Sequence, residues 1–174
     1  PHIDPVNNVL VKISASGICG SDVGIYQGTN AAATYPRVIG HEIVGHVVEV
    51  GEGATKVKVG DRVIVDQVVA CGHCYACRKG RPNVCGDLHV RGVHVDGGYR
   101  EYMAVPDKDC YLVPEMLTDA EAVMIEPTTI AVQCCSRAQI EEMDDVMIVG
   151  CGALGSSILR VVKLFNPHSI TVCD

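Results

Sequence analysis

Four cysteines lie within one short stretch of the sequence, at Cys71, Cys74, Cys77 and Cys85. Two glycines and a proline in the same stretch indicate a loop rather than a strand or a helix. Cysteines separated by two residues can present successive thiolates to one ion, and four thiolates complete a tetrahedral zinc site with no open position. Such a zinc ion would hold the loop and perform no chemistry. Two disulfides, unrelated free thiols and a zinc-ribbon docking module are the alternatives.

A second set of metal-binding side chains lies earlier in the sequence. Cys19 falls in "GICGSD", and His41 and Glu42 fall in "GHEIVG". A cysteine, a histidine and a carboxylate with a vacant fourth position form a zinc site suited to hydrolytic or redox chemistry. Each residue alone has a plainer explanation, because a cysteine before glycine is usually a small buried side chain and a His-Glu pair usually lies on the surface.

A third candidate is Glu126, in "MIEPTT". The residue before a proline is disfavoured in helical geometry, so we expect Glu126 just outside a helix that Pro127 opens. The helix dipole would favour a carboxylate there. The preceding "AVMI" is apolar, which predicts a partly buried carboxylate in need of a partner, at the seam between two domains. The alternative is a surface glutamate that caps the helix.

A glycine pattern near the end of the sequence has the form G-x-G-x-x-G. Its positions are Gly150, Gly152, Ala153, Leu154 and Gly155. It follows the apolar run "VMIV" and precedes a segment with helical periodicity, the context that a dinucleotide-binding turn requires. Asp174 stands about 20 residues further on, where an acidic residue binds the ribose 2′-hydroxyl and repels a 2′-phosphate. The pattern predicts NAD rather than NADP; a glycine turn with no ligand is the alternative.

Composition excludes several classes of protein. The 174 residues include 14 basic and 21 acidic side chains, with no basic cluster that would indicate a nucleic-acid surface. No apolar run approaches the roughly 18 residues of a membrane span. Residues 1–10 have neither the basic start nor the apolar core of a secretion signal, so we expect a cytoplasmic protein whose ten cysteines serve metal binding rather than disulfides.

The order of the expected elements indicates an α/β protein. Four valine-rich runs predict strands in the first half of the sequence, at 6–13, 43–50, 61–68 and 98–105. Thr118 and Glu121 have the capping-box spacing that starts a helix, and "PTTIAVQCCSRA" predicts a second helix. Residues 144–174 then read as strand, glycine turn, helix and strand. We expect two domains, 1–127 and 128–174.

Together these motifs resemble the zinc-dependent medium-chain dehydrogenase/reductase superfamily, which includes the alcohol dehydrogenases. The resemblance runs from "GICGSD" and "GHE" through the cysteine loop, "DGGYREY" and "IEP" to the glycine turn. "IEP" is similar to the polyol and sugar dehydrogenase branch, and the longer run resembles bacterial sugar-acid dehydrogenases such as L-galactonate or L-gulonate 5-dehydrogenases. The resemblance implies a GroES-like catalytic domain followed by a Rossmann domain, of which only the beginning is present. We therefore expect the natural protein to continue for roughly 100–200 residues.

The resemblance also implies roles for individual residues. Cys19 and His41 correspond to ligands of a catalytic zinc, and Glu42 and Glu126 to carboxylates that bind that zinc or hold its water. Ser21 corresponds to the hydroxyl that relays the substrate proton. Asp22 corresponds to the carboxylate that orients the histidine ligand. Many relatives have a histidine where this sequence has Gly24, so the onward path of the proton stays unassigned.

The implied reaction oxidises a secondary alcohol to a ketone and transfers a hydride to NAD, with one catalytic and one structural zinc. The expected partner is a small polyol or sugar acid, such as a hexonate, and neither nucleic acid nor a membrane. We also expect a homo-oligomer, a dimer or a tetramer. The alternatives are a dehydrogenase for L-threonine, a simple polyol or a sugar phosphate, and a non-catalytic zinc-binding protein on the same fold.

Overall fold

The computed structural model describes all of residues 1–174, which form two compact units. The first unit comprises Pro1–Val123 and the second Met124–Asp174. The domain boundary expected from the sequence, after residue 127, falls inside the first helix of the second unit.

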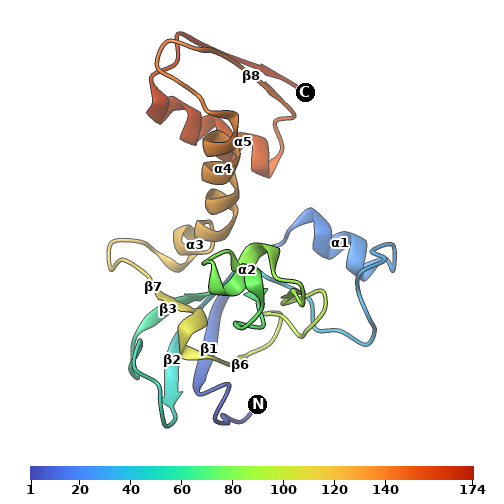
Figure 1. The fold of residues 1–174 in the computed structure, drawn as a ribbon, viewed down its shortest axis with the longest axis vertical. Coiled ribbons are helices and arrows are strands. Elements are labelled where there is room, and N and C mark those ends of the chain that lie inside the picture. The colour runs from blue at the N-terminus through green and yellow to red at the C-terminus, as the bar shows by residue number, and fades with distance from the viewer. The chain divides into compact units, whose positions relative to one another are not determined.

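The first unit is built on a five-stranded antiparallel sheet (Figure 1). Its strands, in spatial order, are β6 (Tyr102–Val105), β1 (Val9–Ser16), β2 (Ile43–Val50), β3 (Arg62–Val65) and β7 (Cys110–Leu112). Strand β2 has the bounds that the valine-rich run predicts. Antiparallel pairing allows one face of the sheet to be buried and the other to stay polar. In β1, Val9 and Val11 are fully buried, whereas Lys12 is exposed.

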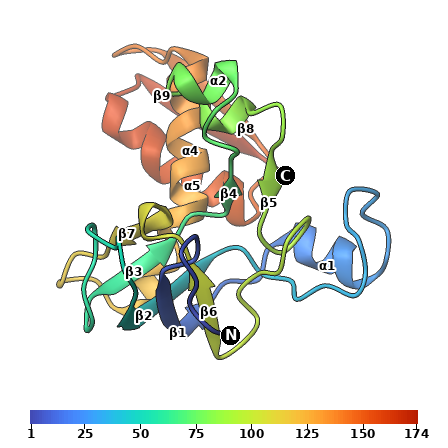
Figure 2. The ribbon, with the colours of Figure 1, turned by 60° about the horizontal axis from the view of Figure 1, so that its bottom comes forward.

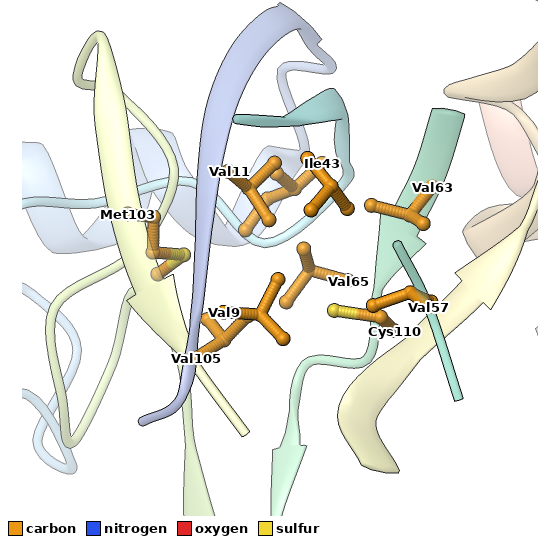
Figure 3. Packing of buried hydrophobic residues seen from close by; sticks show 10 residues of the cluster. Val9, Val11, Ile43, Val57, Val63, Val65, Met103, Val105 and Cys110 are labelled. Carbon is orange, nitrogen blue, oxygen red and sulfur yellow. The ribbon is translucent and has the colours of Figure 1, made fainter. Parts of the chain in front are cut away.

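The core of this unit consists mainly of valine. Figure 3 shows the buried side chains converging from the strands of the sheet. The cluster contains Val9, Val11, Ile43, Val47, Val57, Val63, Val65, Met103, Val105 and Cys110. The protein has one phenylalanine and no tryptophan, so β-branched side chains fill the core. Such side chains are stiff and pack well on a pleated surface, and each contributes about 1.5–3 kcal/mol when fully buried.

Two of the expected strands are shorter in the structure. The run 61–68 divides because the Asp66 carboxylate accepts a hydrogen bond of 2.9 Å from the Val68 N–H. The chain then forms β4 (Val68–Val69), which pairs with β5 (His89–Val90) in a separate two-stranded sheet. The run 98–105 forms a strand only from Tyr102 onward, because its first residues hydrogen-bond to another loop.

The expectation of a cysteine loop without helix is wrong. It contains the four-residue helix α2 (Tyr75–Arg78) and the 3₁₀ turn η1 (Pro82–Val84). Gly72 and Gly80 adopt positive φ, at 79° and 71°, and turn the chain on either side of α2. These turns leave room for a single helical turn between them, which is too short to produce a periodic pattern in the sequence.

Three further short elements complete the first unit. They are α1 (Gly20–Tyr26), the 3₁₀ turn η2 (Asp107–Asp109) and α3 (Asp119–Ala122). Helix α3 confirms the expected capping box: Thr118 Oγ1 accepts from the Glu121 N–H at 3.3 Å, and the Glu121 carboxylate accepts from the Thr118 N–H at 2.8 Å. These bonds satisfy two backbone donors that a helix start leaves free.

The second unit contains a βαβ arrangement preceded by a helix. Its elements are α4 (Ile125–Ala138), β8 (Asp145–Val149), α5 (Ala153–Val162), the 3₁₀ turn η3 (Lys163–Phe165) and β9 (Ser169–Cys173). Strands β8 and β9 pair in parallel (Figure 2). Helices α4 and α5 pack together, with Ala131 and Cys135 buried beside Val161 and Val162. This unit has the strand, glycine turn, helix and strand predicted for residues 144–174.

The expectation that Glu126 lies outside a helix is wrong. Helix α4 begins at Ile125, so Glu126 and Pro127 both lie in its first turn. The first backbone N–H groups of a helix have no intrahelical acceptor, so a proline there removes no hydrogen bond. The bias of the residue before proline is a preference, which the helix overcomes here.

Every helix of the structure is too short or too polar to cross a membrane.

Candidate functional site

The four cysteines of the loop form a compact cluster of sulfur atoms. The Sγ atoms of Cys85 and Cys71 lie 3.4 Å apart, those of Cys74 and Cys77 3.5 Å, those of Cys74 and Cys85 3.8 Å, and those of Cys71 and Cys77 4.0 Å. Four sulfurs each about 2.3 Å from a tetrahedral zinc would stand about 3.8 Å from one another. All four cysteines are free thiols. The cluster therefore fits a zinc ion and not a pair of disulfides.

Backbone N–H groups point at these sulfurs. The Cys71 N–H donates to Cys85 Sγ, the Cys74 N–H to Cys71 Sγ and the Asp87 N–H to Cys85 Sγ, at 3.3–3.4 Å. Hydrogen bonds to sulfur favour the charged thiolate. Backbone donors at Cys77 and Gly86 lower the pKa of Cys74 to about 6, whereas burial and the neighbouring Cys74 raise the pKa of Cys77 to about 12. The loop thus places four sulfur ligands around one point, and its backbone donors favour the thiolate form of Cys74.

The second cluster comes from the ends of two neighbouring strands. Strands β1 and β2 are antiparallel, and Ser16 pairs with Ile43. The residues that follow β1 therefore lie beside those that precede β2, which brings Cys19 next to His41 and Glu42. One ligand atom from each of these three side chains lies within 4.8 Å of the others. Ligand bonds of about 2.0–2.3 Å would require only small rotations for the three to share one ion.

The Asp22 carboxylate lies next to this cluster and hydrogen-bonds to both of its loops. Its side chain is almost fully buried, with the residue 1 % exposed. Oδ2 accepts from the Cys19 N–H at 2.9 Å, and Oδ1 accepts from the Gly40 N–H at 3.2 Å. Oδ1 also lies 3.3 Å from His41 Nδ1, at an angle that does not make a hydrogen bond, so this buried nitrogen has no hydrogen-bond partner. Histidines that bind metals usually donate their other ring N–H to a carboxylate, and Asp22 is placed to receive it.

Two glycines allow the loops of this cluster to approach closely. A side chain at Gly17 would overlap the Glu42 carboxylate. A side chain at Gly40 would overlap the ring of Tyr99, and Gly40 has a φ of 96°. Only glycine adopts that conformation readily. The glycines that flank the two motifs thus have a direct part in building the cluster.

The remaining residues of the expected catalytic site are placed as follows. Ser21 lies in the first turn of α1, exposed, two positions after Cys19. Gly24 lies further along the same helix, and its carbonyl accepts from the Thr29 N–H at 2.9 Å. Glu126 belongs to the second unit, in α4. The structure thus brings Cys19, His41 and Glu42 together, with the Asp22 carboxylate next to His41.

The glycine turn of the second unit has the geometry of a nucleotide-binding turn. Gly150 has a φ of 97°, and a side chain at Gly155 would overlap the Gly150 carbonyl, so helix α5 packs directly against the end of β8. Gly152 caps α5 and faces open space, and Ala153 and Leu154 begin the helix. Asp174 Oδ1 accepts from the Cys151 N–H at 3.0 Å. The start of a helix with free N–H groups and an open glycine is a favourable site for a phosphate group.

Residues 5–115 match the family model described as the alcohol dehydrogenase GroES-like domain. The chain belongs to this family. The match covers all four motifs of the first unit, and with the βαβ unit that follows it the chain has the α/β organisation of the medium-chain dehydrogenases.

Individual relatives support the same assignment. The chain is 50 % identical over 167 residues to the starvation-sensing protein RspB of Escherichia coli K12, covering 95 % of this chain and 49 % of that protein. It is 39 % identical over 157 residues to the L-galactonate-5-dehydrogenase of the same strain, covering 90 % and 46 %. The chain spans about half the length of the curated relatives it matches.

A solved structure has the same fold. It is described as a short chain alcohol dehydrogenase (RspB) from Escherichia coli CFT073, complexed with the cofactor NADH. The two chains share 48 % identity with a TM-score of 0.92, and the match covers 100 % of this chain and 51 % of the other. At this similarity the dehydrogenase fold of both units is established.

Tyr99 lies beside the second cluster and was not among the site residues expected from the sequence. The Tyr99 hydroxyl lies 3.1 Å from Asp22 Oδ2 and 3.0 Å from the Gly17 carbonyl oxygen. Burial, followed by the charge of Asp22, raises the pKa of this hydroxyl above its usual value, so it is protonated at neutral pH and acts as a donor. Its position in "DGGYREY", directly after two glycines, was the only signal in the sequence.

Proposed function

We propose that this protein is a zinc- and NAD-dependent oxidoreductase that oxidises a secondary alcohol of a polyol or a sugar acid. The observation that carries the proposal is the cluster of Cys19, His41 and Glu42, within a domain of the alcohol dehydrogenase family. The three side chains offer a thiolate, an imidazole and a carboxylate, the donor types that zinc prefers, and three protein ligands are the number that leaves a position for substrate.

Each residue of the cluster would have its own role. Cys19 and His41 would hold the ion, and Asp22, whose Oδ1 lies 3.3 Å from His41 Nδ1, would orient the imidazole once the ring binds a metal. A bound zinc supplies Lewis acidity, which makes the substrate hydroxyl easier to deprotonate. Ser21 Oγ receives that proton and passes it to water, since Gly24 has no side chain to continue a relay. NAD, when bound, would supply the hydride acceptor.

The third protein ligand is Glu42 or Glu126. Glu42 is 8 % exposed and lies in the cluster already, so it is the ligand that the geometry of the first unit supports. Glu126 is the second candidate, as the resemblance to the polyol branch implies. With one of these carboxylates and the Cys19 thiolate bound, two negative charges would balance the charge of Zn²⁺. We expect a weaker Lewis acid than at a site with one thiolate and two neutral ligands.

The glycine turn and Asp174 would bind NAD. The adenosine ribose would hydrogen-bond to the Asp174 carboxylate, which would repel the 2′-phosphate of NADP. Replacing Asp174 with alanine is expected to raise KM for NAD by roughly 10- to 100-fold, the equivalent of a hydrogen bond to a charged group. The same change should lower the ratio of kcat/KM with NAD to kcat/KM with NADP. Steady-state kinetics with both cofactors would measure this, and a wild-type protein that prefers NADP would contradict the assignment.

One relative supports the proposed substrate class. The L-galactonate-5-dehydrogenase carries a name that specifies a sugar acid, and it is 39 % identical to this chain. We propose a hexonate or a related polyol as the substrate. The alternatives are L-threonine and sugar phosphates.

The substrate proposal is tested by NAD reduction with the full-length protein. Hexonates, simple polyols, L-threonine and sugar phosphates are compared at equal concentrations, and we expect the highest kcat/KM for a hexonate. A preference for L-threonine or for a sugar phosphate would contradict the hexonate proposal and identify that compound's class as the substrate class. The absence of NAD reduction with every member of the panel would favour a non-catalytic zinc protein. A Cys19→Ala variant, assayed in parallel, identifies any activity from a contaminating enzyme.

A further inference from the structure

We propose that Tyr99 is a positioning residue of the second cluster: its hydroxyl holds the Asp22 carboxylate beside His41 Nδ1, where the carboxylate can accept that N–H when the imidazole binds a metal. The inference rests on the proposed function, because it concerns the metal affinity and reactivity of the centre formed by Cys19, His41 and Glu42. Tyr99 does not touch the reacting atoms in this role. It acts through Asp22.

The contacts of the hydroxyl place it between two segments of the site. It lies 3.1 Å from Asp22 Oδ2 and 3.0 Å from the Gly17 carbonyl oxygen. A hydroxyl has one proton, so these two acceptors share a single donor. The carboxylate is the stronger acceptor because it is charged. The Tyr99 hydroxyl therefore binds mainly to Asp22 and keeps the segment beginning at Gly17 within reach.

Tyr99 is itself held by the segment that carries His41. The Gly97 N–H donates to the Val38 carbonyl at 2.7 Å, and the Gly98 N–H donates to the Gly40 carbonyl at 2.8 Å. The Tyr99 N–H donates to the Ile39 carbonyl at 3.0 Å. Three consecutive backbone hydrogen bonds thus fix residues 97–99 to the three residues before His41.

The ring is fixed as well as the backbone. It lies against Gly40 so closely that a side chain there would overlap it. Beside this contact, Arg37 Nη1 and Asp96 Oδ1 form an ion pair of 2.9 Å between the same two segments. The hydroxyl is therefore presented to Asp22 on a rigid support, as precise positioning of a metal ligand requires.

The other donors to Asp22 show why this hydroxyl matters. Two of them are backbone N–H groups, from Cys19 and Gly40. These two donors lie on the loops that carry the metal ligands. Tyr99 is the side-chain donor. Because residues 97–99 are hydrogen-bonded to the loop that carries His41, its hydroxyl adds a further link between that loop and Asp22. Removing its hydroxyl would leave Oδ2 with the Cys19 N–H and allow the carboxylate to rotate away from His41 Nδ1.

The test is the Tyr99→Phe variant of the full-length protein, which keeps the ring on Gly40 and removes only the hydroxyl. Zinc affinity is measured by competition with a chromogenic chelator, and the visible spectrum is recorded after cobalt substitution of the centre. We expect a 10- to 100-fold lower affinity at the second cluster, the usual cost of losing a group that orients a metal ligand. The cobalt spectrum should change, and the zinc of the cysteine loop should be retained.

A matched control and a second variant separate positioning from a general structural effect. Tyr111 is half exposed on β7 and its ring contacts Lys56, so Tyr111→Phe should change neither measurement. If Tyr99 acts through Asp22, Tyr99→Phe should add little to the effect of Asp22→Asn, because neighbouring groups that work together are not additive. Full additivity of the two changes would contradict the inference.

The outcomes distinguish this inference from the proposed function. A wild-type protein that binds two zinc ions, with affinity and cobalt spectrum unchanged in Tyr99→Phe, would overturn the role of Tyr99 alone. A wild-type protein that binds zinc only in the cysteine loop would overturn the proposed function and this inference with it.

Discussion

Replacing Cys19 with alanine is expected to lower kcat/KM for the alcohol by roughly a thousand-fold. The change removes the only thiolate of the second cluster, and with it the firm attachment of a catalytic zinc. The Lewis acidity of such an ion is worth several kcal/mol, and about 4 kcal/mol corresponds to this factor. Zinc content should fall from two ions per chain to one. Steady-state kinetics and metal analysis of the same purified sample would measure both effects.

The control for this variant is Cys134→Ala. Cys134 is exposed on helix α4 and belongs to neither cluster. We expect the control to keep two zinc ions and normal turnover. Normal turnover in Cys19→Ala would show that the reaction does not need this cluster.

The second large effect is expected from Cys74→Ser in the loop. Cys74 lies within 3.5 Å of Cys77 Sγ and 3.8 Å of Cys85 Sγ, so its loss opens the coordination shell. Structural zinc sites contribute folding energy directly, and losing one is among the largest effects of a single substitution. We expect the midpoint of thermal unfolding to fall by about 10 °C or more. Calorimetry together with zinc analysis would measure the change.

The cysteine-loop variant and the Cys19 variant should lose different properties. Cys74→Ser should keep the zinc of the second cluster and lose stability, whereas Cys19→Ala should keep stability and lose turnover. Cys134→Ser again serves as the control. Unchanged stability in Cys74→Ser, or a disulfide between Cys71 and Cys85 in the purified protein, would contradict a structural zinc.

Features with a local cause could be predicted from the sequence. The cysteines of the loop are close in the chain, and turns at Gly72 and Gly80 suffice to gather them. The capping box of Thr118 and Glu121 likewise depends on neighbours only. The glycine turn was recognisable because a strand and a helix flank it. In each case the pattern and the structure that it produces lie within about 20 residues.

Features that depend on distant segments could not be predicted. Tyr99 reaches Asp22 because residues 97–99 pair with residues 38–40, and no local pattern indicates this pairing. The strand expected at 61–68 ends early because Asp66 binds the Val68 N–H and the chain turns to another sheet. The helical position of Glu126 has a different, local reason. Its bias as the residue before proline is weaker than the formation of a 14-residue helix.

The proposed function depends most on the presence of two zinc ions in two different kinds of site. Anomalous diffraction at the zinc absorption edge, from crystals of the full-length protein, locates both directly. We predict one peak surrounded by Cys71, Cys74, Cys77 and Cys85, and a second peak within about 2.0–2.3 Å of Cys19 Sγ and a His41 ring nitrogen. The second peak would also show whether Glu42 or Glu126 is the third ligand. A single peak in the cysteine loop, with none beside Cys19 and His41 in zinc-replete crystals, would contradict the account.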